Sequence, residues 1–241
     1  MLFSTSCKKE SKQDQSLTLE EYRDLGLPDH NEIWSYNDYV NTCKILSNMK
    51  VFYPLSLPKK DSKKSGEYFN RIIDPENFLF LLDETIPLRA RAQMIQKYVD
   101  IQGSLITSYT DLDNVKQNYN RELIDLYIFG LTIAQNMLDL GQRINESVDE
   151  DDIDMQYGYL SIQHVYIKMI LFVLDNQRKS YFFIEADLEK LSKFISESIM
   201  LNRDWMGAPA IEDIEQGLRK VIINTSSGLI KEEYQKLIET L

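Results

Sequence analysis

The densest set of groups that could do chemistry is an acidic run, Asp149-Glu150-Asp151-Asp152-Ile153-Asp154. Several carboxylates this close together could hold a hard cation such as calcium or magnesium, because these ions prefer oxygen ligands. The run does not form an EF-hand, since the turn glycine and the terminal glutamate of that calcium loop are missing. Glu150, Asp151 and Asp154 are therefore the candidate metal ligands.

The spacing Glu150-Asp151-x-x-Asp154 resembles the aspartate-rich magnesium motif of the all-α isoprenoid synthases. The resemblance implies a metal-dependent helical enzyme, with the motif inside a long helix that lines a deep cavity. A second acidic motif would stand opposite, and the chain has no convincing second copy. The competing interpretation places these acids in the loop and first turn of a helix starting near Asp152, where the helix dipole favours negative charge. We favour that interpretation and keep the metal-dependent enzyme as the alternative.

Histidine chemistry is limited to His30 and His164. Neither follows a glutamate by three residues, as di-iron helical bundles require, and no CxxC, CxxH or HxxxH spacing offers a zinc site. The GxSxG, GxxxxGK[ST] and GxGxxG motifs are also missing. His164 shares a helical face with Leu160, Ile167 and Leu171, so we expect it in the core. We therefore predict a non-catalytic protein that needs no cofactor.

Aromatic residues cluster in the segment 27–39, which holds His30, Trp34, Tyr36 and Tyr39. Such segments can bind proteins or glycans, because Trp and Tyr combine a large area with a polar group. The competing interpretation is that Trp34, directly before a capping serine, is the apolar staple that fixes the entry of a helix. We favour the staple and keep the four residues as candidate binding residues for an unknown protein or glycan partner.

The N-terminus opens Met1-Leu2-Phe3-Ser4-Thr5-Ser6-Cys7 and then turns polar up to residue 16. This pattern resembles the cleavage site of bacterial lipoproteins, in which small residues precede a cysteine. The resemblance covers residues 1–16 and implies that the Cys7 sulfur takes a diacylglycerol and becomes the first mature residue. The basic segment and most of the apolar segment of such a signal are missing, so we expect a longer native start or a trimmed sequence.

A lipid anchor would place the protein in the bacterial cell envelope, periplasmic or on the outer surface, with a cytoplasmic location as the alternative. Membrane contact is then expected only through Cys7, and residues 8–16 would be a polar tether. Cys43 is tolerated unpaired in that compartment only if buried, and the helical pattern around it predicts burial.

Composition excludes some partners. The formal net charge of −11 disfavours nucleic acid. We interpret the lysine-rich segment 59–64 as a solvated loop, with an anionic lipid or an acidic partner as the alternative. Only 9 Gly and 6 Pro occur in 241 residues, too few for the turns of a β-sandwich.

Apolar residues that recur every three or four positions predict an all-α fold. We expect eight or nine helices in one irregular bundle over residues 17–241, because no internal repeat of about 33 to 47 residues indicates a solenoid. Thr18 with Glu21 and Ser35 with Asp38 are expected capping pairs, and Asp74 a third helix start. The clearest expected helices are 35–49, 111–144, 152–176, 186–201, 209–223 and 229–241.

Overall fold

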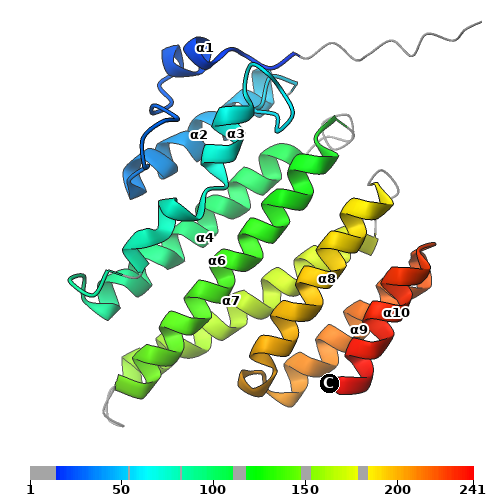
Figure 1. Cartoon of the computed structure of the whole chain (residues 1–241). Coiled ribbons are helices and arrows are strands. Elements are labelled where there is room, and N and C mark those ends of the chain that lie inside the picture. The colour runs from blue at the N-terminus through cyan, green and yellow to red at the C-terminus, as the bar shows by residue number, and fades with distance from the viewer. Residues whose placement is uncertain (1–14, 54, 82, 111–117, 148–152, 179–183) are drawn as a thin grey trace, which may run out of the picture.

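The computed structural model describes residues 15–53, 55–81, 83–110, 118–147, 153–178 and 184–241 (Figure 1). Within these ranges the chain forms α-helices and two short 3₁₀ helices, and it has no strand. The expected all-α multi-helix bundle is confirmed. The elements are α1 (Leu19–Asp24), α2 (Tyr36–Phe52), α3 (Gly66–Ile72), η1 (Pro75–Leu81), α4 (Leu88–Thr110), α6 (Asn120–Ser147), α7 (Ile153–Arg178), α8 (Glu185–Asn202), η2 (Arg203–Trp205), α9 (Ala208–Asn224) and α10 (Gly228–Thr240).

Local sequence chemistry sets the helix starts. Both expected capping boxes are present. The backbone N–H of Glu21 donates to Thr18 Oγ1, and the backbone N–H of Thr18 donates to the Glu21 carboxylate. Ser35 and Asp38 form the same pair of hydrogen bonds. These reciprocal bonds satisfy backbone N–H groups that the first helical turn leaves unpaired. The start at Asp74 leads into the 3₁₀ helix η1 rather than an α-helix.

Helix α6 lies at the centre of the bundle. It packs against α4, α7 and α8, while α2 lies beyond α4 and α9 beyond α7, and α10 contacts both α8 and α9 (Figure 1). By length and composition alone, residues 120–143 could cross a membrane, but 72% of that apolar stretch is buried in the fold, as in the core helix of a folded domain.

Gly130 on α6 lies against side chains from both α4 and α7. A Cβ atom at Gly130 would overlap Cε of Met169 on α7 and lie 3.2 Å from Nε2 of Gln102 on α4. Any larger residue would therefore displace the flexible ends of the Met169 and Gln102 side chains.

Polar side chains also join α6, α7 and α8. The hydroxyl of Tyr166 on α7 donates to the carbonyl of Ser198 on α8 at 2.8 Å. Asn202 Nδ2 donates to Tyr166 Oη at 3.0 Å, and Gln135 Nε2 on α6 donates to Asn202 Oδ1 at 2.9 Å. The buried polar groups of this joint therefore satisfy one another, which fixes the relative position of the three helices.

Three tyrosines hold the loop between α2 and α3. Tyr22 donates to the carbonyl of Ser56 at 2.6 Å, Tyr109 to Pro58 at 2.9 Å, and Tyr119 to Leu57 at 3.2 Å. The tyrosines come from α1, α4 and the residue before α6, so the loop is tied to three separate parts of the chain.

Helix α7 has one face open to solvent, which contradicts the expectation that His164 lies in the core. Leu160, His164, Lys168 and Phe172 are exposed and follow each other at intervals of four residues, so they form one open stripe along the helix. The reason is that α7 packs mainly on α6 and α9, and this leaves a third face in solvent. His164 is accordingly a surface residue and not the core histidine that the helical pattern predicted.

We expect Tyr109→Phe to destabilise the fold by about 1 to 3 kcal/mol, because it leaves the buried Pro58 carbonyl without a donor. Burial holds the pKa of Tyr109 well above its usual value, so the hydroxyl remains a donor at ordinary pH. Urea unfolding measures the loss. Tyr53→Phe is the control, because that side chain is 63% exposed. Equal stability of the two variants would contradict the loop's dependence on Tyr109.

Candidate functional site

The sequence-predicted metal ligands lie almost wholly outside the described residues. Glu150 and Asp151 are outside them, as is Cys7, while Asp154 lies in the first turn of α7. Within the part of the chain that the structure describes, no group of three His, Cys, Asp or Glu residues could hold a metal ion. Metal binding by the acidic run therefore stays a prediction.

Two of the four candidate binding residues are enclosed by the fold. Trp34 is 2% exposed, and its Nε1 donates to the carbonyl of Asp29 at 2.9 Å. Tyr39 is fully buried and packs against Phe78 and Tyr98, with ring centroids 5.5 and 5.1 Å away. Neither ring is open to a partner in this structure.

The other two candidates also make internal contacts. His30 Nε2 lies 2.6 Å from Oε2 of Glu67, and its ring is 5.1 Å from that of Tyr68. Tyr36 is half-buried, and its ring packs edge-on against that of Tyr98, with the ring centroids 4.8 Å apart. These contacts give the segment a packing role. Binding of a protein or glycan by its four residues stays a prediction.

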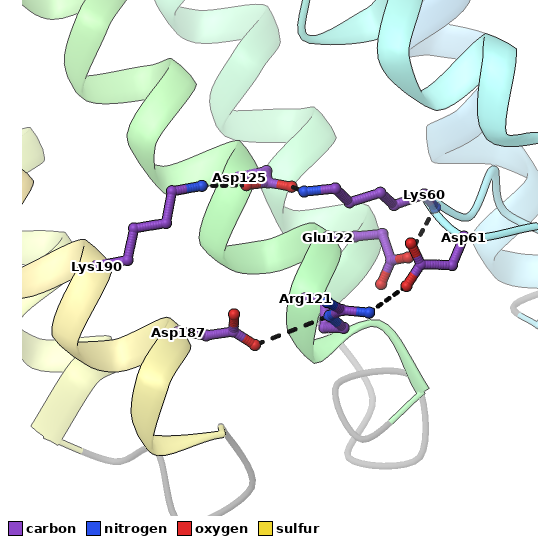
Figure 2. A network of polar contacts seen from close by, with 7 residues as sticks. All are labelled: Lys60, Asp61, Arg121, Glu122, Asp125, Asp187 and Lys190. Carbon is purple, nitrogen blue, oxygen red and sulfur yellow. Dashed lines mark hydrogen bonds and ion pairs between the residues drawn. The ribbon is translucent and has the colours of Figure 1, made fainter.

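A network of charged side chains joins three parts of the chain (Figure 2). Asp125 on α6 is buried and lies between two lysines: Lys60, from the loop before α3, bonds Oδ2, and Lys190 on α8 lies 3.1 Å from Oδ1. Lys60 is thus an anchor of its loop, which corrects the interpretation of 59–64 as solvated lysines at this one position. Lys63 and Lys64 are exposed, as that interpretation expects. The local sequence gives no sign of this ion pair, because Asp125 lies 65 residues from Lys60 along the chain.

The same network continues along α6. Arg121 forms an ion pair with Asp61, and its Nε lies 4.0 Å from Asp187 on α8. Glu122 is buried and accepts a hydrogen bond from the backbone N–H of Lys60 at 2.8 Å. Burial raises the pKa of Glu122, because removal from water disfavours the charged form. Each carboxylate here meets a cation or an N–H group within the chain, so we interpret the network as a joint between segments.

A hollow between α4, α6 and α7 has the composition of a ligand site, and we call it the α4–α6–α7 groove. Its volume is about 460 Å³, within the range typical of small-molecule sites. Its walls are mostly apolar. The lining residues are Gln102, Gly103, Ile106 and Thr107 of α4, Gly130 and Ala134 of α6, and Val165, Lys168, Met169 and Phe172 of α7.

Gln102 is the unusual member of the groove. Its side chain is buried, with 3% of the residue exposed, and Nε2 has no hydrogen-bond partner among the described residues. A buried donor without an acceptor costs about 1 to 3 kcal/mol, so the group is costly to keep unless something binds it. The sequence held a weak signal, because Gln102 interrupts an otherwise apolar stripe between Tyr98 and Leu105.

Lys168 supplies the one charged side chain in the lining of the groove. It is exposed, and within the described ranges no carboxylate lies close enough to form an ion pair with it. The groove therefore offers an apolar wall, a buried N–H donor and a cation. This set of groups can bind a molecule that has an apolar part, a hydrogen-bond acceptor and a negative charge.

Comparison with known proteins gives no relative: no family model matches the chain, and no curated protein or solved structure is detectably similar. The groove and the N-terminal residues are therefore the features of this chain that bear on its function.

We expect Glu122→Gln to be more stable than the native chain at neutral pH. The raised pKa means that ionised Glu122 costs folding free energy there, and glutamine keeps an oxygen acceptor for Lys60 without the charge. This cost disappears as the pH falls through the raised pKa to the ordinary glutamate value, so the advantage of the variant must vanish at acid pH.

Urea unfolding of both proteins at neutral and acid pH measures this difference. Glu146→Gln is the matched control, since it makes the same substitution at an exposed glutamate of the same helix. A Glu122→Gln variant that is less stable at neutral pH would contradict the account of a desolvated carboxylate.

Proposed function

We propose that this protein is a non-catalytic, lipid-anchored binding domain of the bacterial cell envelope. It is attached to the membrane through Cys7, and it binds its ligand in the α4–α6–α7 groove. The observation that carries the binding role is the groove itself. It combines apolar walls with a buried donor at Gln102 that has no partner within the described part of the chain. Binding sites of this kind combine apolar area, which gives affinity, with a few polar groups, which fix orientation.

Stability favours a binding role over a purely structural one. An apolar residue of similar size at position 102 would fill the same space without an unsatisfied donor, and replacement of buried polar groups by apolar ones is often neutral or stabilising. Retaining glutamine therefore costs the free protein stability. A ligand that accepts a hydrogen bond from Nε2 would offset that cost.

The anchor rests on the resemblance of residues 1–16 to lipoprotein cleavage sites. Each buried acyl methylene contributes about 0.8 kcal/mol, so several acyl chains on one cysteine suffice to hold a folded domain at a membrane. The polar segment 8–16 then separates the helical body from the headgroups.

If the groove is a binding site, anilinonaphthalene sulfonate should bind with one site per chain and gain fluorescence. Gly103→Leu should abolish this binding, because Gly103 lines the groove and a side chain there enters open space. The same variant should unfold at a higher temperature, since leucine is a better helix former than glycine. Loss of binding with gain of stability excludes unfolding as the cause.

Gly103→Ala is the matched control for the dye experiment. Its single methyl group also meets no atom within 4 Å, so it should keep the dye site while gaining helix stability. Dye binding that survives Gly103→Leu would show that the dye binds elsewhere and would contradict the proposal.

The anchor has its own test. Expression of the complete native gene in a bacterium with radioactive palmitate should give a labelled, membrane-associated product, and Cys7→Ser should lose both the label and the membrane association. Cys43→Ala should keep both, because Cys43 is buried in the fold. A native product that stays soluble and unlabelled would contradict the envelope assignment.

A further inference from the structure

The walls of the α4–α6–α7 groove favour a flexible apolar chain. Ile106, Ala134, Val165, Met169 and Phe172 come from three helices and present methyl, thioether and aromatic surfaces. Such a surface makes few directional contacts, and methionine adapts its shape to its neighbour. The wall therefore suits an acyl chain better than a sugar, whose hydroxyl groups would need partners on every side.

The buried donor selects a neutral oxygen. Gln102 and Gly130 both line the groove, and the buried Nε2 of Gln102 lies beside Gly130. One amide N–H cannot compensate a carboxylate for the loss of its water. The carbonyl oxygen of an ester or amide is an acceptor that carries no charge. The ligand atom beside Gln102 is thus expected to be a carbonyl oxygen.

Lys168, the cation in the lining of the groove, favours a ligand that carries a negative charge. Lys168 is exposed and has no carboxylate partner within the described ranges, although acidic residues outnumber basic ones by 38 to 27 in the chain. A lysine on a long flexible stem can reach an anionic group at the solvent edge of a ligand while its methylenes cover apolar surface.

We propose that the α4–α6–α7 groove binds an acyl chain joined through a neutral carbonyl to an anionic group. The inference rests on the proposed function and names the ligand class of the same site. The acyl chain lies against the apolar walls, the ester or amide carbonyl accepts from Nε2 of Gln102, and the anionic group faces Lys168. Acylated amino acids and anionic acyl lipids share this chemistry.

N-decanoylglycine is the probe, since it has one acyl chain, one amide carbonyl and one carboxylate. It should displace anilinonaphthalene sulfonate and bind with one site per chain in titration calorimetry. N-decanoylethanolamine keeps the chain and the carbonyl but has no charge, and decanoate has no carbonyl apart from its charged group. Both should bind more weakly than N-decanoylglycine. Vesicles of phosphatidylglycerol, tested separately, distinguish a membrane lipid from a free acyl compound as the source of the ligand.

Gln102→Met tests the carbonyl contact. The variant should bind N-decanoylglycine about tenfold more weakly, which corresponds to one hydrogen bond. Its melting temperature without ligand should be equal to or above that of the native chain, because the substitution removes a buried donor that lacks a partner. A change that merely disturbed the fold would lower both binding and stability.

Lys168→Gln tests the anionic group. It should weaken binding of N-decanoylglycine and leave binding of N-decanoylethanolamine unchanged. His164→Gln is the matched control, because His164 is exposed one turn earlier on the same stripe and does not line the groove. This control should bind both compounds as the native chain does.

The outcomes separate the two proposals. If the dye binds in the groove but N-decanoylglycine does not displace it, the ligand class is wrong and the proposed binding role remains. If neither compound binds, both proposals are overturned. Full affinity for N-decanoylglycine in Gln102→Met overturns the assignment of the carbonyl, and full affinity in Lys168→Gln overturns the assignment of the anion.

Discussion

Helix α6 is enclosed by α4, α7 and α8, and the rest of the fold depends on satisfying its surface. Its apolar side chains gain from burial, but its buried polar groups must find partners, because an unpaired buried charge is strongly destabilising. Asp125 forms ion pairs with Lys60 of the loop before α3 and with Lys190 of α8. Glu122 accepts a hydrogen bond from the backbone N–H of Lys60. The central helix thus determines where the N-terminal segments and α8 attach.

The same enclosure produces the groove. Gly130 on α6 has no side chain, and the space beside it is taken by the ends of the Gln102 and Met169 side chains. Small residues on α6 leave a hollow beside this contact. Its walls are apolar, and the Nε2 donor of Gln102 has no partner among the residues that the structure describes. Packing alone explains the apolar walls, whereas it gives no reason for a buried amide.

Local rules predicted most of the helices, while long-range contacts decided the site. The capping boxes at Thr18 and Ser35 depend on residues three positions apart, so the sequence shows them directly. The roles of Lys60 and Gln102 depend on residues brought together from distant helices, which periodicity does not reveal. His164 was placed in the core because its helical neighbours are apolar, but α7 has an open face.

Gln102 is proposed to keep its buried Nε2–H donor for a ligand carbonyl. The side-chain amide of Gln102, assigned by comparison with Gln102→Met in a ¹⁵N–¹H nuclear magnetic resonance spectrum, reports on this donor directly. The account predicts that saturation with N-decanoylglycine shifts the Gln102 Nε2–H resonances and slows their exchange with water, while the exposed amide of Gln93 stays unchanged. Gln102 resonances that remain unmoved at saturation would contradict the account.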